Sequence, residues 1–234
     1  MAMVFERASR GRLLSCSFVL LLAWLQAPPA GADAAAGEKL FAAKQCGSCH
    51  QISGPVEALP VAERSKIKGP PLWFAGSKFQ SAWLSAWLQA PKPIRRVKYG
   101  TLTEGANEHS ALSAGDAKEI AAYLMSLADA AIKTAVKVKK LSRRKKFKGE
   151  KLFAKKQVCF GCHQYPSRQG IIGGFSAPSL VGAGERLQGA WIDAFLKDNA
   201  RYYPNGRMPV YGDKAFTPYT KKELSLLVQY IGNL

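Results

Sequence analysis

The pattern Cys-x-x-Cys-His occurs twice in this chain of 234 residues, at positions 46–50 and 159–163. Each copy follows the same hexapeptide, Gly-Glu-Lys-Leu-Phe-Ala, at positions 37–42 and 149–154. A repeat this long is a domain and not a solenoid unit, so the sequence predicts two tandem domains. Beyond the motifs, identical residues recur at one constant offset: Pro70 and Pro178, Leu72 and Leu180, Ala75 and Ala183, Gln80 and Gln188, and Trp83 and Trp191.

Both pentapeptides are typical of covalent haem attachment. Two thiols one helical turn apart can form thioethers with the two vinyl groups of one porphyrin, and the adjacent histidine then binds the iron. A disulfide or redox pair needs no histidine after each second cysteine. A four-cysteine zinc site usually brings its two pairs within about 20 residues, whereas Cys49 and Cys159 are far apart in the sequence. We therefore expect two covalent haem c groups and no zinc, held by Cys46, Cys49, His50, Cys159, Cys162 and His163.

Residues 1–34 have the three parts of a secretory signal peptide. Three arginines precede an apolar run at residues 13–25, and small residues follow at 30–34. The run is shorter than the roughly 20 residues of a membrane-spanning helix. We expect this segment, with Cys16, to be removed on export to the periplasm.

The composition is strongly basic, with 34 Lys and Arg against 16 Asp and Glu and a net charge of +18. Such a surplus predicts an anionic partner. Export argues against nucleic acid, which leaves an acidic redox protein, a membrane oxidoreductase complex or anionic lipid. A solvated linker without a partner is the alternative for the basic run between the domains. That run contains Lys133, Lys137, Lys139, Lys140, Arg143, Arg144, Lys145, Lys146 and Lys148.

The pattern of apolar residues indicates an all-α fold with long loops. We expect domains at 35–130 and 148–234, joined by a basic linker at 131–147. Gly and Pro crowd the stretches between helical segments, and no convincing strand alternation is present. Loop-rich domains of about 90 residues bury little apolar area, so a cofactor is expected to fill each interior. Each domain is expected to end with an amphipathic helix that begins at a cap. The first helix has its apolar face at Ala117, Ile120, Ala121 and Leu124 and its cap at Ser113 and Asp116. The second has its apolar face at Leu224, Leu227, Val228 and Ile231 and its cap at Thr220 and Glu223.

Each half resembles a class I cytochrome c domain, and the whole resembles exported dihaem cytochromes c. The resemblance covers about residues 36–128 and 148–234. It implies two helical domains, each wrapped around a covalent haem, with the N-terminal helix of each domain crossing its C-terminal helix. It also implies that the backbone carbonyls of Pro70 and Pro178 accept hydrogen bonds from the proximal histidines. Trp83, Trp87 and Trp191 are expected in the core or against haem.

The sixth iron ligands are predicted by elimination from few candidates. Beyond the two motifs, the mature chain has only His109, Met125 and Met208 as imidazole or thioether ligands. Met208 stands in an irregular stretch before the last helix, where the family places its distal methionine. The matching position of the first domain lies near Gly100 or Thr101, which cannot serve, so His109 is favoured there. An open iron, or ligation by Lys98 or Tyr99, stays possible. The expected iron ligands are therefore His50, His109, His163 and Met208.

These features favour an electron-transfer protein of the kind found in respiratory chains over an enzyme. Met/His ligation raises a haem potential and bis-His ligation commonly leaves it lower. Electrons are therefore expected to enter at the first haem and leave from the second. The alternative is a small haem enzyme, peroxidase-like or oxyanion-reacting, with an open first iron fed by the second. No acid or base for such chemistry is identifiable near the first motif.

Overall fold

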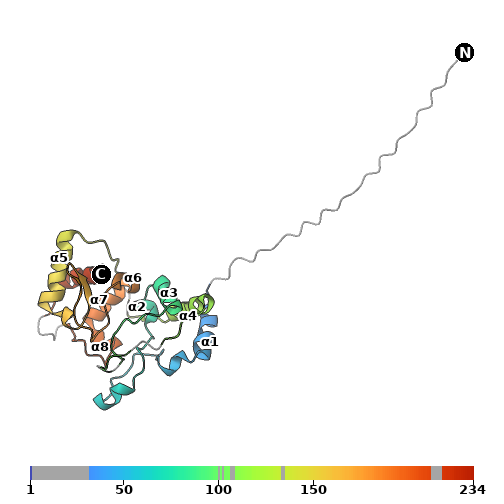
Figure 1. Cartoon of the computed structure of the whole chain (residues 1–234), viewed down its shortest axis with the longest axis horizontal. Helices are drawn as coiled ribbons and strands as arrows, with labels where there is room; N and C mark the ends of the chain where they lie inside the picture. The colour runs from blue at the N-terminus through green and yellow to red at the C-terminus, as the bar shows by residue number, and fades with distance from the viewer. Residues whose placement is uncertain (2–31, 100, 102, 106–108, 133–134, 212–217) are drawn as a thin grey trace. The chain divides into compact units, whose positions relative to one another are not determined.

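The computed structural model describes residues 1, 32–99, 101, 103–105, 109–132, 135–211 and 218–234 (Figure 1). The predicted signal peptide, with Cys16, lies outside the described residues for almost its whole length, as do Gly100 and Lys133. Ala32–Leu234 form one compact unit. In the part of the chain that is described, no helix is long and apolar enough to cross a membrane.

The first half, residues 32–132, is built around its last helix. Gly37 allows the first helix to cross this last helix closely, because a Cβ at Gly37 would overlap the carbonyl oxygen of Glu119. Phe41 packs edge-on against Tyr123, with ring centroids 5.4 Å apart. The elements are α1 (Ala34–Ala43), η1 (Cys46–Ser48), η2 (Val61–Lys66), α2 (Ala75–Lys78), α3 (Ser81–Gln89) and α4 (Ala114–Ser126).

The second half, residues 135–234, repeats this plan. Its first helix crosses its last at Gly149, where a Cβ would press on Tyr230. Phe153 fills the core beside Tyr165 and Tyr230. The expected crossing of N- and C-terminal helices is therefore present in both halves. The elements are α5 (Arg143–Lys151), a π-helical turn η3 (Leu152–Lys156), η4 (Cys159–Gly161), β1 (Tyr165–Ser167), β2 (Gly170–Ile172), α6 (Ala183–Arg186), α7 (Gly189–Lys197), α8 (Asn199–Tyr202) and α9 (Lys221–Ile231).

The two predicted closing helices, α4 and α9, are confirmed together with their caps. The Ser113 hydroxyl accepts a hydrogen bond from the Asp116 amide at 3.1 Å. Thr220 and Glu223 form a complete capping box. Both caps satisfy amides that have no partner inside the helix.

Two local features differ from the expectation. A small antiparallel hairpin pairs Tyr165 with Ile172, so the fold is helical with one short two-stranded sheet. Strands of three residues are too short to show alternation, and this is why the sequence pattern missed them. Helix α5 begins at Arg143, inside the range 131–147 where a linker was expected.

The two halves meet through equivalent segments. The Gln80 amide donates to the Arg186 carbonyl, and the Gln188 amide donates to the Lys78 carbonyl, both at 2.9 Å. Gln80 and Gln188 are partners in the internal repeat, so the duplicated segments pair reciprocally across the joint. The buried apolar side chains of both halves, except Val97, belong to one hydrophobic cluster. The two halves are therefore packed against each other and are not independent domains joined only by a linker.

Candidate cofactor and metal sites

The first cysteine motif lies on a single turn of 3-10 helix directly after α1. The amides of Cys49 and His50 both donate to the Cys46 carbonyl, at 3.2 and 3.1 Å. Gln45, just before the turn, has a left-handed backbone with φ 55°. Neither cysteine is in a disulfide, and Cys49 is exposed. The turn therefore presents two free thiols beside a histidine.

The second motif repeats the same backbone. The amides of Cys162 and His163 donate to the Cys159 carbonyl at 3.2 and 3.0 Å, and Val158 before the turn has φ 50°. A left-handed backbone at a β-branched residue is strained, and such strain collects at functional sites. Cys159 and Cys162 are also free of disulfides.

The two proximal histidines are oriented alike. His50 Nδ1 lies 2.8 Å from the Pro70 carbonyl oxygen, and His163 Nδ1 lies 2.7 Å from that of Pro178. A carbonyl can only accept, so Nδ1 carries the proton and Nε2 keeps its lone pair for a metal. Burial lowers the pKa of both imidazoles, which favours the neutral form that binds metals. The hydrogen bonds that the resemblance implied are confirmed.

The first half brings His109 to His50. The two rings stack with centroids 5.6 Å apart, and Trp87 meets the His109 ring edge-on at 4.9 Å. Burial, followed by the charge of His50, lowers the pKa of His109. Tyr99, one of the alternatives, instead lies beneath the guanidinium of Arg95 at 5.4 Å. The contact with His50 favours His109 as the sixth ligand, which stays a prediction.

Met208 lies in a loop after α8 and packs partly buried against the core. The amide group of Asn199, itself buried, donates to the carbonyls of Met208 and Pro209 at 3.0 and 2.8 Å. Two contacts tie this loop to the first half. Arg207 donates to the Thr101 carbonyl at 3.0 Å, and the side chain of Asn205 accepts from the Leu59 amide at 2.6 Å. The first half thus helps to position the predicted ligand of the second haem.

Two tyrosines surround the Cys159 sulfur, and sequence reasoning missed both. Tyr211 and Tyr219 hydrogen-bond to Cys159, and their rings lie 5.9 Å apart. Burial raises the pKa of the Cys159 thiol and of both phenols. Burial thus favours the neutral thiol of Cys159 over the thiolate, against the opposing effect of the two phenol hydrogen bonds.

Several buried donors in the described residues lack a protein acceptor. The indole nitrogens of Trp73 and Trp191 and the Nε of Arg95 are buried without a hydrogen-bond partner. Such groups are costly unless something accepts from them. The two carboxylates of a haem are acceptors of the required kind.

Two cations at the joint between the halves, Arg186 buried and Lys78 partly buried, also lack an acidic partner in the described part of the chain. Lys78 donates to the Tyr203 hydroxyl at 2.7 Å and lies against aromatic rings, with the Trp191 centroid at 5.0 Å. Burial lowers the pKa of Lys78 to about 7. Arg186 donates to the Ser179 carbonyl at 2.7 Å, and burial lowers its pKa to about 10. Neither forms an ion pair among the described residues. These unpaired cations and hydrogen-bond donors thus fit a cofactor that carries carboxylate groups, as haem does.

The metal-binding side chains also fit a porphyrin. Nowhere in the described residues do three or more His, Cys, Asp or Glu side chains gather around one point. A pair such as His50 and His109 would offer an iron two ligands, and a porphyrin would supply four more. An open pocket of about 360 Å³ has walls that include Trp83, Arg186 and Trp87, and Trp87 also contacts His109. Trp191 is buried in the core as expected, whereas Trp83 and Trp87 are only partly buried.

The family model for cytochrome c matches residues 34–128 and 147–234, more than half of the chain. No curated protein and no solved structure matches the chain.

Proposed function

Since the chain belongs to the cytochrome c family over two tandem regions, we propose that it is an exported dihaem cytochrome that carries single electrons between redox partners. The observation that carries this proposal is the repeated arrangement of a free cysteine pair next to a histidine held at Nδ1 by a proline carbonyl. Haem iron supplies one-electron chemistry when bound. Cys46, Cys49, Cys159 and Cys162 would hold the two groups, and His50 and His163 would bind the irons.

The protein's own contribution is to make the two sites unequal. His109 lies at the first site and Met208 in the loop of the second half. An imidazole sixth ligand commonly leaves the potential lower than a thioether does. We therefore expect electrons to enter at the first site and leave from the second.

The contact between His109 and His50 favours an electron carrier over the enzymatic alternative. A small haem enzyme needs an open iron position for its substrate. The nearness of the His109 ring to the His50 ring, with centroids 5.6 Å apart, supports His109 as the residue that would fill that position.

The net charge of +18 supports an anionic partner. An acidic redox protein or a membrane oxidoreductase complex in the periplasm is the partner class that this charge favours, because opposite charges steer encounter. The carrier can be free or a subunit of such a complex.

A potentiometric titration of the holoprotein tests this function. We expect two one-electron steps per chain, with the lower potential at the first haem. The His109→Met variant should raise only the lower potential, and Met208→His should lower only the higher one. One electron per chain, or a first-haem potential at or above the second, would contradict the proposal.

A further inference from the structure

Exposed cations gather along α5 and the segments next to it in the chain, and we call this region the basic face. Ten lysine and arginine side chains in the described part of the chain contribute to it, and all are exposed. None of the ten forms an ion pair among the described residues. Glu150 is the single acidic residue between the first and the last of them. The basic face consists of Lys137, Lys139, Lys140, Arg143, Arg144, Lys145, Lys146, Lys148, Lys151 and Lys155.

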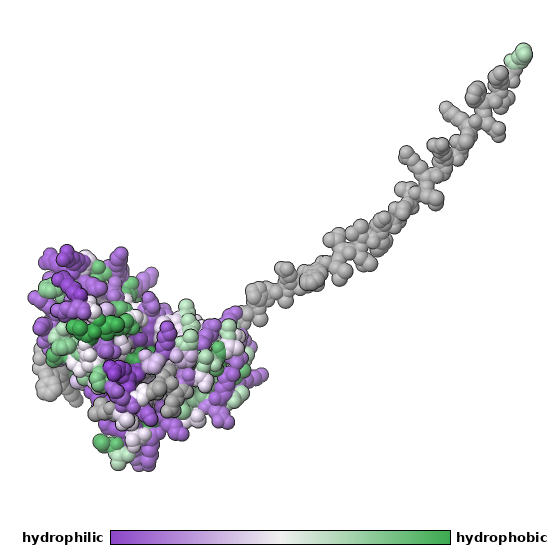
Figure 2. Space-filling model, in the orientation of Figure 1, coloured by the Kyte–Doolittle hydropathy of each residue, from purple (hydrophilic) through white to green (hydrophobic). Residues whose placement is uncertain are grey.

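The basic face is fixed in place by the fold. The segment before α5 is tied to the end of α9, because Gln229 accepts from the Lys139 amide at 2.7 Å and donates to the Lys137 carbonyl at 2.9 Å. Helix α5 itself is fixed by Gly149 against Tyr230. Figure 2 shows hydrophilic side chains covering the region of α5. The charged side chains thus extend from backbone that is packed on the second half, and not from a flexible linker.

The first turn of α5 is positively charged, whereas negative charge stabilises the N-terminus of a helix. Arg143, Arg144, Lys145 and Lys146 follow one another there, and the turn has no acidic residue. A helix N-terminus carries a partial positive charge, so cations at this end repel it and one another. An anionic surface near this end of the helix would relieve the repulsion, since it would bring negative charge to the cations and to the helix terminus.

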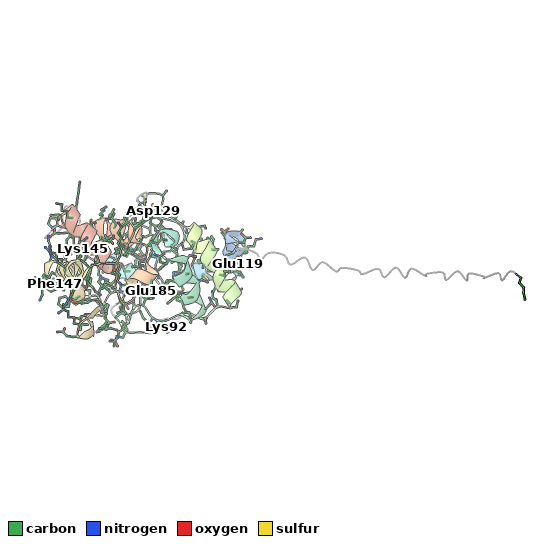
Figure 3. The ribbon with its side chains drawn as sticks, turned by 90° about the horizontal axis from the view of Figure 1, so that it is seen from above. Lys92, Glu119, Asp129, Lys145, Phe147 and Glu185 are labelled. Carbon is green, nitrogen blue, oxygen red and sulfur yellow. The ribbon has the colours of Figure 1, made fainter. Side chains whose placement is uncertain are left out.

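An exposed aromatic ring lies within this cluster. Phe147 is 48% exposed, and the Lys151 ammonium lies 4.8 Å from its ring centroid. Lys145 and Phe147 lie together on α5, well apart from Glu119 on α4 (Figure 3). A phenyl ring among lysines can enter the boundary between headgroups and acyl chains.

The composition of the basic face distinguishes between two kinds of anionic partner. The centre of a specific protein interface is depleted of charged residues, lysine above all, and rich in apolar contacts. The basic face is instead nearly all lysine and arginine with one phenyl ring. Clusters of this kind on a helix are typical of binding to anionic phospholipids.

We propose that the basic face binds the surface of a bilayer that contains anionic phospholipids and holds the protein at the membrane. This binding is independent of the proposed electron transfer, because it uses side chains on α5 and the preceding segment and none of the predicted haem ligands.

Sedimentation of the holoprotein with lipid vesicles tests the proposal. The probes are vesicles of phosphatidylcholine alone and of phosphatidylcholine mixed with phosphatidylglycerol, at about 0.1 M salt. We expect binding to the mixed vesicles only. The variant R143Q/R144Q/K145Q/K146Q should bind them at least about a hundredfold more weakly. Phe147→Ala should weaken the binding to mixed vesicles that remains at higher salt, where electrostatic attraction is screened.

The matched control removes four exposed charges from the first half, in K39Q/K66Q/K68Q/K92Q. It should change vesicle binding by less than about threefold, since charges away from the membrane surface contribute little. Haem absorbance and thermal unfolding report whether each variant is folded. Equal losses in both variants would show a net-charge effect and overturn the proposal. Failure of the wild-type protein to bind mixed vesicles would also overturn the proposal. So would an R143Q/R144Q/K145Q/K146Q variant that binds vesicles like wild type and loses only its electron transfer with an acidic ferredoxin.

Discussion

Val158 has φ 50° although its side chain is β-branched and 58% exposed. The left-handed backbone sets the turn that carries Cys159 and Cys162, so its strain is the cost of presenting the second thiol pair. Gln45 does the same before Cys46. The sequence motif shows which residues attach a cofactor, but the conformation of the residue before the motif is evident only in the structure.

Replacing Val158 with glycine should stabilise the holoprotein by about 1 kcal/mol, because glycine adopts positive φ without steric cost and little packing is lost. Urea unfolding measures the effect. Val158→Ala is the control, since alanine keeps the strain. A gain in stability for alanine equal to that for glycine would show that the backbone is not the cause.

Asn199 is the residue most directly placed to hold the Met208 loop. Asn199→Ala should destabilise the holoprotein by about 1–3 kcal/mol, since two carbonyls lose a buried donor. It should also allow carbon monoxide to bind the second haem more readily. Asn199→Asp, which has the same shape but cannot donate, should behave like the alanine variant. Wild-type behaviour of the aspartate variant would contradict this role.

At the scale of elements, each half depends on a close crossing of its first and last helices. The glycine of the repeated hexapeptide makes this crossing possible in both halves. The repeat was visible in the sequence, and so were the closing helices and their caps. The reason why positions 37 and 149 require glycine could not be predicted from the sequence, because it depends on the helix that packs against Gly37 and Gly149.

Gly37→Ala should destabilise the protein by at least about 2 kcal/mol, because the added methyl group meets the backbone carbonyl of Glu119, which cannot move aside. Gly115→Ala is the matched control. A Cβ there meets only the Ser113 hydroxyl, at an ordinary contact distance of 3.9 Å, so this variant should be at least as stable as wild type. Similar unfolding free energies for the two variants would argue against the close crossing.

At the scale of the whole molecule, the two halves behave as one body. Asp129, whose side chain is 4% exposed, forms a double hydrogen bond with Arg201 at 2.9 and 3.0 Å and accepts from the Tyr202 hydroxyl at 3.1 Å. These contacts fix the chain after α4 to α8. The sequence predicted the two domains and their motifs, but not the joint, because pairing between distant segments leaves no local pattern. Asp129, Tyr211 and Tyr219 are missed for this reason, and Asn199 is missed because its partners lie in an irregular loop with no sequence pattern.

The ion pair between Asp129 and Arg201 should make stability pH-dependent. The Arg201 hydrogen bonds lower the pKa of Asp129 below its usual value. Its contribution is therefore present above about pH 4, the unfolded value, and is lost as the pH falls through the lower folded value. The difference in unfolding free energy between wild type and Asp129→Asn should shrink progressively below about pH 4. A difference that does not change with pH would assign the effect to packing alone.

The central claim is a protein with two haems whose sixth positions are both filled. Electron paramagnetic resonance of the oxidised holoprotein, with carbon monoxide then added to the reduced form, tests it most directly. We expect two low-spin haems and no binding of carbon monoxide. A high-spin signal with carbon monoxide bound at the first haem would show that His109 does not hold the iron, and would favour small-ligand chemistry over electron transfer.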